Sequence, residues 1–168
     1  MSRSTARTAA MQMIFEKLSG GEGSEETLRM IYEELLGDAS PYAGMPETAA
    51  DGEVETEAPA PKWDKAFRDD HAWILRALSG VLEHLDEIDA EINRCSRGWT
   101  VERMPRVDLT ILRLAAWEIL FENDPHVPAP VAINEALEIA AKYSDPDSGR
   151  FINGVLGSIN RAKEAQQA

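Results

Sequence analysis

The segment that most constrains the fold is residues 106–122, RVDLTILRLAAWEILFE, whose apolar side chains would cover most of the circumference of a helix. A helix that is apolar nearly all round must be surrounded by other parts of the protein. We therefore expect this segment at the centre of a helical bundle. An alternating run of β-branched residues, the pattern of a half-buried strand, occurs nowhere in the 168 residues. The sequence thus predicts an all-α fold.

The N-terminal part of the chain carries two shorter helical patterns, followed by a stretch that cannot pack a core. Residues 6–18 predict a first helix, and Ser24 begins a second helix that Gly37 ends. Residues 37–62 hold four prolines and six acids, so we expect an exposed, flexible loop there. We predict one domain over residues 1–168, with N-terminal helices in 1–36, the acidic loop in 37–62, the main helical core in 63–163 and a tail in 164–168.

Helical spacing returns after this loop. Apolar residues recur every three or four positions from Asp64 to Ile92, with a bend expected near Asp86. Gly98 interrupts the pattern, and Thr100 can cap a short turn that leads into the central segment. We therefore expect a bent helical stretch and a short turn before residue 106.

Residues 131–156, VAINEALEIAAKYSDPDSGRFINGVL, predict two helices joined by a tight acidic turn. Pro130 stands at a natural first helical position, and Pro146 ends the helix because it disfavours α geometry at Asp145. The junction gathers polar groups, two cations and two aromatic rings: Lys142, Tyr143, Asp147, Ser148, Arg150 and Phe151. Such a set suits a contact with nucleic acid or protein, and it does not suggest covalent chemistry.

The distribution of charge matters more here than the net charge of −13. Residues 37–61 contribute −6 of that total, whereas the first fifteen residues carry Arg3 and Arg7 and no acid. Exposed charges more than about 10 Å apart are largely screened at ordinary salt. An acidic total therefore weakens the case for a nucleic-acid binder without removing it.

The residues that commonly build catalytic centres are sparse. Cys95 is the only cysteine, so the chain has no internal disulfide and no cysteine-based zinc site. The three histidines lie far apart in sequence, and no glycine-rich phosphate loop or nucleophile motif occurs. Arg94 and Arg97 could lower the pKa of the Cys95 thiol; the alternative is that Cys95 only packs. We expect no enzyme activity, no metal and no cofactor.

Segments that would direct the chain to a membrane are also missing from the sequence. No apolar run reaches the roughly 18 residues that a transmembrane helix needs. The first ten residues, MSRSTARTAA, lack the apolar core of a secretory signal peptide. We therefore expect a soluble, cytoplasmic protein.

Three segments resemble the NusB family of bacterial antitermination factors: WTVERMPRVDLTILRLAAWEILFE at 99–122, PVAINEALEIAAKYSDPDSGRFINGVL at 130–156 and, more loosely, ARTAAMQMIF at 6–15. The resemblance implies about seven helices in two packed subdomains. It also implies a non-catalytic protein that binds the small-subunit ribosomal protein NusE. The pair would hold boxA-type single-stranded RNA in nascent ribosomal RNA transcripts and help RNA polymerase read through terminators.

The resemblance also implies which residues make these contacts. The N-terminal segment of the family is typically rich in arginine, and this chain has only two arginines there, so we expect weaker and less salt-sensitive RNA binding. The implied RNA-binding residues are Arg3, Arg7, Lys142, Tyr143, Asp147, Ser148, Arg150 and Phe151. The implied residues for the protein partner are Phe15, Glu102, Arg103 and Asp108.

Several alternatives stay open at this point. Phe151 can stack on a base or pack in the core, and the acids Glu102 and Asp108 can orient a basic partner or stabilise helix N-termini. At the level of the whole chain, the alternatives are a dimerising or protein-interaction module, and an accessory domain of an RNA methyltransferase. The second arises because the same helical domain occurs fused to a cytosine methyltransferase. The preferred RNA sequence, the oligomeric state and the role of residues 38–62 are also open.

Overall fold

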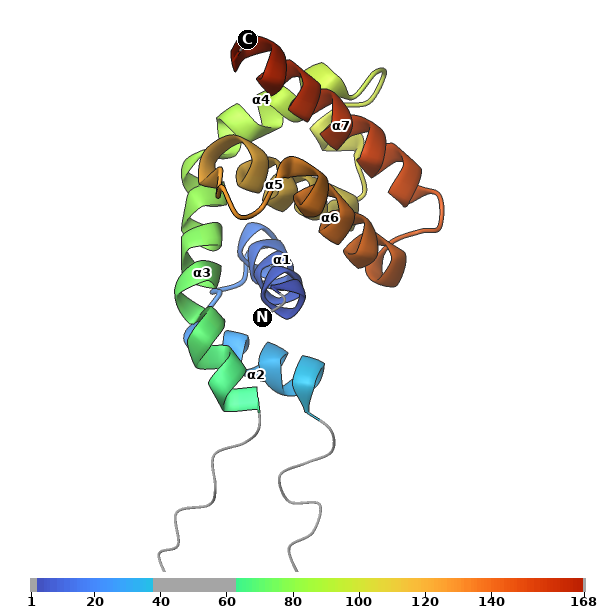
Figure 1. Ribbon diagram of the computed structural model, residues 1–168. Coiled ribbons are helices and arrows are strands. Elements are labelled where there is room, and N and C mark those ends of the chain that lie inside the picture. The colour runs from blue at the N-terminus through green and yellow to red at the C-terminus, as the bar shows by residue number, and fades with distance from the viewer. Residues whose placement is uncertain (1–2, 38–62, 168) are drawn as a thin grey trace, which may run out of the picture.

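The computed structural model describes residues 3–37 and 63–167 (Figure 1). Nearly all of the predicted acidic loop therefore lies outside the described residues. The described chain is helical and contains no strand, which confirms the all-α prediction. Its elements are α1 (Ser4–Leu18), α2 (Glu25–Leu36), α3 (Trp63–Glu83), α4 (Leu85–Cys95), η1 (Val101–Arg103), α5 (Arg106–Trp117), η2 (Glu118–Glu122), α6 (Ala129–Tyr143) and α7 (Ser148–Gln167).

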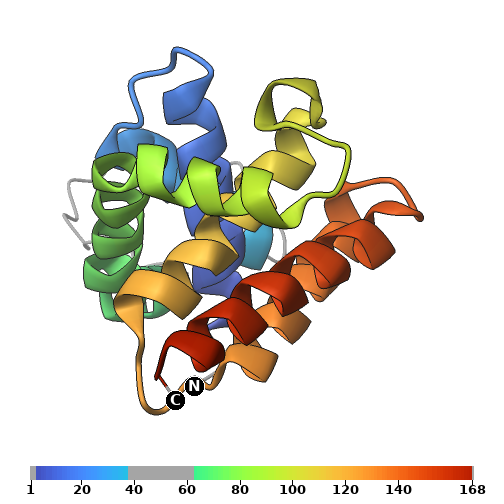
Figure 2. The ribbon, with the colours of Figure 1, turned by 90° about the horizontal axis from the view of Figure 1, so that it is seen from above.

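Helix α5 is the central element, as its apolar circumference predicts. Nearly all of its residues are buried. It contacts α1 and α3 of an N-terminal group of helices, α1–α3, and it packs against α4, α6 and α7 of its own group. Figures 1 and 2 show α6 and α7 side by side, with α4 beside α7. One hydrophobic cluster runs through both groups, so the two predicted subdomains are packed on a shared core.

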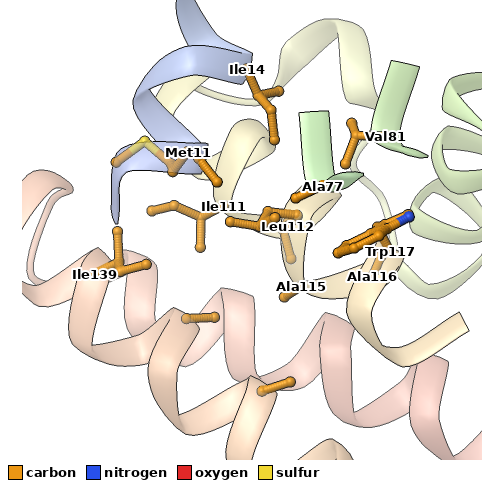
Figure 3. Packing of buried hydrophobic residues seen from close by; sticks show 14 of the residues in the cluster. Met11, Ile14, Ala77, Val81, Ile111, Leu112, Ala115, Ala116, Trp117 and Ile139 are labelled. Carbon is orange, nitrogen blue, oxygen red and sulfur yellow. The ribbon is translucent and has the colours of Figure 1, made fainter. Parts of the chain in front are cut away.

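The centre of this core lies where α1, α3 and α5 meet (Figure 3). Side chains from all three helices contribute: Met11, Ile14, Ala77, Val81, Ile111, Leu112, Ala115, Ala116 and Trp117. Gly80 of α3 lets the backbone approach the indole of Trp117, because a Cβ at Gly80 would lie 2.1 Å from Trp117 Nε1. The absence of a side chain at Gly80 therefore makes room for the Trp117 ring.

Local signals place most helix ends correctly. The Ser24 hydroxyl accepts a hydrogen bond from the Thr27 amide at 3.2 Å, as an N-cap does, and α2 stops before Gly37. The bend predicted near Asp86 is a break at His84, between α3 and α4. Helix α6 begins one residue before Pro130.

Two local predictions are wrong. The Thr100 side chain does not cap η1; the Asn93 side-chain carbonyl does this instead, accepting from the Val101 amide at 2.9 Å. Residues 164–167, predicted as a tail, continue α7. The sequence there, EAQQ, is rich in strong helix formers. In the preceding turn Lys163 donates to the Asn123 side-chain carbonyl at 2.6 Å, which ties this end of α7 to the protein.

A buried ion pair joins helix α1 to the segment that follows α5. Arg7 of α1 donates three hydrogen bonds of 2.9 to 3.1 Å to the Glu118 carboxylate, which begins the π-helical segment η2. Both side chains are almost fully buried, and the Arg7 guanidinium lies 5.7 Å from the centre of the Trp73 ring. Burial raises the pKa of Glu118, and Arg7 offsets part of that effect. The pair thus connects α1, α3 and η2.

Replacing Arg7 with methionine should leave the Glu118 carboxylate buried without a cation. We expect Arg7→Met to lower the free energy of unfolding by about 3–5 kcal/mol, measured by urea denaturation. The control is Arg76→Met, which breaks a similar two-bond pair with Glu122 at the surface and should cost less than about 1 kcal/mol. Equal losses for the two variants would contradict a structural role for the buried pair.

Candidate nucleic-acid and partner interface

Within the described residues, no helix has the length and apolarity to cross a bilayer, and no cluster of three or more histidine, cysteine, aspartate or glutamate side chains is arranged to hold a metal ion. Burial raises the pKa of the Cys95 thiol and outweighs the opposite effect of Arg94. Arg94 therefore acts in the direction that the sequence suggested, but the pKa is raised overall, and the packing alternative fits the site.

Exposed cations without a carboxylate partner gather in two segments of the described chain, residues 97–106 and 142–161. Elsewhere most arginines pair with acids: Arg3, Arg7, Arg29, Arg68, Arg76, Arg94 and Arg113. In these two segments, six exposed cations form no ion pair with a described carboxylate: Arg97, Arg103, Arg106, Lys142, Arg150 and Arg161. Their charge is available to an anionic ligand.

Three of these cations line a groove between the end of α4 and helix α7, which we call the arginine groove. It has a volume of about 470 Å³ and is lined by Cys95, Ser96, Arg97, Trp99, Arg150, Phe151, Gly154, Val155, Ser158 and Arg161. The Trp99 side chain is 51% exposed and meets Phe151 edge to face, with ring centres 6.3 Å apart. The groove therefore combines guanidinium groups with an exposed aromatic surface.

A second groove, the junction groove, lies against the turn between α6 and α7. It has a volume of about 570 Å³, and its lining residues are Trp99, Met104, Pro105, Asp108, Asp145, Pro146, Asp147, Ser148 and Phe151. Trp99 and Phe151 line both grooves. The aromatic pair thus stands between an arginine-lined and an aspartate-lined depression.

Asp108 of α5 holds the turn between α6 and α7 in place. Its carboxylate is buried and accepts hydrogen bonds from the hydroxyls of Ser144 and Ser148, the latter at 2.8 Å. A buried carboxylate requires such donors. The sequence placed Asp108 on the partner surface and Ser148 on the RNA surface, whereas the structure turns both side chains inward and binds them to each other.

A third groove, the α1–α2 groove, is mainly apolar and has a volume of about 370 Å³. It is lined by Met11, Gln12, Phe15, Glu16, Thr27, Ile31, Val107 and Tyr143. Tyr143 is exposed, and its hydroxyl accepts a hydrogen bond from the Gln12 amide at 3.5 Å. Tyr143, which the sequence grouped with Phe151, therefore lies beside Phe15.

The two N-terminal arginines do not join the junction. Arg7 is buried in its pair with Glu118, so its guanidinium is not available to a phosphate. Arg3 is partly exposed and pairs with Asp124 at 3.3 Å, in the loop before α6. The junction follows the other end of α6, a 15-residue helix that is roughly 22 Å long.

The remaining predicted residues are at the surface. Glu102 and Arg103 are exposed on η1, next to the junction groove, and Lys142, Asp147 and Arg150 are exposed around the α6–α7 turn. Sequence reasoning did not identify Trp99 as a site residue. The available signal was a large aromatic residue directly after Gly98, the residue that interrupts the helical pattern; in the structure Gly98 has a positive φ of 82° and Trp99 lies in a loop.

Residues 47–161 match the profile of the NusB family. The transcription antitermination protein NusB of Geobacter sulfurreducens is 42% identical to this chain over 139 residues, which cover 82% of this chain and 90% of the relative. The chain belongs to the NusB family. The family and the antitermination function expected from the resemblance are therefore confirmed.

Further NusB proteins share both sequence and fold with the chain. NusB of Sorangium cellulosum is 36% identical over 157 residues, covering 94% of this chain and 90% of the relative. The structure of T. maritima NusB aligns with a TM-score of 0.64 at 30% identity and covers 100% of this chain and 99% of that one. A crystal structure of NusB and NusE in complex with dsRNA has the same fold, with a TM-score of 0.65 at 20% identity, and covers 95% of this chain and 96% of that one.

Removing the Asp108 carboxylate should loosen the α6–α7 turn. In Asp108→Ala the two serine hydroxyls lose their buried acceptor, and we expect the free energy of unfolding to fall by about 1–3 kcal/mol. Amide hydrogen exchange across residues 144–150 should also become faster. Asp145→Ala removes an exposed carboxylate from the same turn and is the control; similar exchange in both variants would contradict the positioning role of Asp108.

Proposed function

We propose that this chain acts in transcription antitermination by binding boxA-type single-stranded RNA together with a NusE-type ribosomal protein. The observation that carries the proposal is the concentration of exposed cations without a described carboxylate partner in residues 97–106 and 142–161, the two segments that hold the paired rings of Trp99 and Phe151. Such a concentration is unexpected in a protein of net charge −13 unless it serves an anionic ligand. The family relationship supports the same function.

Phe151 offers the RNA a stacking surface. Its ring lies between the arginine groove and the junction groove, and stacking on an aromatic side chain is worth about 1–3 kcal/mol per base. Lys142 and Arg150 are exposed on either side of the turn and can bind phosphates. Asp147 can accept a hydrogen bond from a base amino group. Arg3 can contribute when it leaves Asp124, and we leave the buried Arg7 out of the RNA site.

The α1–α2 groove is the proposed seat of the protein partner. Its apolar lining with two aromatic rings, Phe15 and Tyr143, suits the anchor side chains that dominate protein interfaces. Glu102 and Arg103 are exposed on η1, beside the junction groove, and in this proposal Glu102 orients a basic ribosomal protein while Arg103 adds a polar contact. Asp108 acts indirectly, by holding the turn that presents Tyr143 on one side and Phe151 on the other.

The assembly that we propose has no catalytic step and no cofactor. The chain and its ribosomal partner would bind RNA cooperatively and join the antitermination complex on RNA polymerase, in the cytoplasm where transcription takes place. The alternative is a helical module that dimerises or binds proteins, including an RNA methyltransferase, without RNA affinity of its own. That alternative predicts partner binding or a dimer with no RNA contact.

Replacing Phe151 with leucine should weaken RNA binding and leave the fold intact. In fluorescence anisotropy with a labelled boxA-like RNA and the NusE-type protein, we expect Phe151→Leu to raise the Kd about 5- to 150-fold, since the base loses its stacking surface. Phe121→Leu is the matched control, because Phe121 stacks on His84, away from the grooves. If wild-type protein binds the partner and not the RNA, the protein-interaction alternative is correct.

Replacing Phe15 with alanine should weaken partner binding. We expect the affinity for the NusE-type protein, measured by calorimetry, to fall at least about tenfold, because a buried aromatic anchor is lost. Leu18→Ala changes an exposed apolar residue of the same helix outside the groove and should have little effect. A stable homodimer that Phe15→Ala dissociates, with no ribosomal protein bound, would instead assign the groove to self-association.

A further inference from the structure

Helix α7 builds one wall of the arginine groove from a single stripe of residues. Arg150, Gly154, Ser158 and Arg161 all line the groove, and their spacing of four, four and three residues places them on one face of a helix. The two middle residues are small, so the stripe is open between its two arginines. A Cβ at Gly154 would meet no atom within 4 Å, which confirms that the space above it is empty of protein.

The side chain of Arg161 lies back along this stripe. Its guanidinium donates to the Ser158 hydroxyl at 3.1 Å and lies close above Gly157. The cation at the far end of the groove is therefore directed toward the middle of the groove. Arg97 faces the same space from the loop after α4.

No acid lines the arginine groove. Arg94, one turn before Arg97, is by contrast paired with an acid: it donates two hydrogen bonds of 2.6 and 3.0 Å to the Glu91 carboxylate. Arg97 and Arg150 form no such pair with any described carboxylate. A groove whose charged lining residues are all cations attracts anions.

The loop that carries Trp99 is held in place. The Trp99 amide donates to the Ser96 carbonyl at 3.0 Å, the buried Ser96 hydroxyl donates to the Ile92 carbonyl, and the ring edge rests on Phe151. Half of the Trp99 surface is nevertheless exposed. A positioned and exposed ring beside arginines is the combination by which proteins hold single-stranded nucleic acid.

We infer that the arginine groove is an extension of the RNA site that binds a nucleotide beyond the one stacked on Phe151. Arg97 and Arg161 bind its phosphate, and Trp99 stacks on its base. The groove volume of about 470 Å³ is in the range of ligand sites, and Phe151 makes it continuous with the junction groove. The inference rests on the proposed RNA-binding function.

The test compares a short boxA-like RNA with the same RNA extended by two nucleotides at each end, in the presence of the NusE-type protein. Arg97→Gln and Arg161→Gln should each weaken binding of the extended RNA about tenfold, the effect of one lost hydrogen bond to a charged group. The slope of log Kobs against log salt should become less steep by about 0.7 per variant. Binding of the short RNA should not change.

Arg94→Gln is the matched control, because it removes the same charge from a paired arginine one turn away. It should leave both affinities and both salt slopes as in the wild type. Trp99→Leu should lower the affinity for the extended RNA at least about fivefold, because the base loses its stacking surface, and should leave the salt slope unchanged. Unchanged urea midpoints would establish that the variants are folded.

The outcomes separate the two proposals. If Arg97→Gln and Arg161→Gln behave like Arg94→Gln while the wild type binds both RNAs, the extension is wrong and the proposed function stands. If the wild type binds neither RNA with the partner present, both proposals are wrong. Loss confined to the extended RNA, with the reduced salt slope, establishes the extension.

Discussion

Helix α5 has protein on almost every side, so each polar group that it buries must find its partner inside the molecule. Two carboxylates illustrate this constraint. Asp108, in its first turn, takes hydrogen bonds from Ser144 and Ser148, and Glu118, directly after its last residue, takes three from Arg7. The first contact fixes the α6–α7 turn, and the second fixes α1. The apolar packing of α5 therefore determines where the chain's surface features lie.

Pairing of charged groups also determines where free positive charge remains on the surface. Acids outnumber basic residues in this chain, and most arginines in its described part are neutralised by a nearby carboxylate. The arginines and the lysine of residues 97–106 and 142–161 have no carboxylate partner among the described residues. The nearby acids are placed differently: Asp108 is buried and binds Ser148, and Asp145 and Asp147 line the junction groove. An acidic protein thus keeps a local group of cations without described carboxylate partners, which the net charge alone conceals.

Helical spacing and caps predicted most of the fold, because both are local properties that Ser24, Gly37 and the apolar residues of α5 display in the sequence. The site was harder, because its contacts join residues far apart in the chain: Arg7 meets Glu118 across 111 positions, and Tyr143 meets Gln12 across 131. Part of the signal was nevertheless present. Arg7 lies three, four and seven residues before Ala10, Met11 and Ile14, and Asp108 stands in the same relation to Ile111, Leu112 and Ala115, all of which are buried. Helical spacing alone places both ionisable side chains on core faces.

The α1–α2 groove and the junction groove are linked at two places, where residues adjacent in the chain serve different surfaces. Val107 lines the α1–α2 groove and Asp108 the junction groove; Tyr143 lines the α1–α2 groove, and the next residue, Ser144, donates to Asp108. A partner that binds Val107 and Tyr143, as we propose, would press on groups one peptide bond away from those that hold the α6–α7 turn, where we propose that RNA binds. This contact gives a physical route for cooperative binding of partner and RNA. Thermodynamic linkage then requires that RNA strengthen partner binding by the same factor by which the partner strengthens RNA binding.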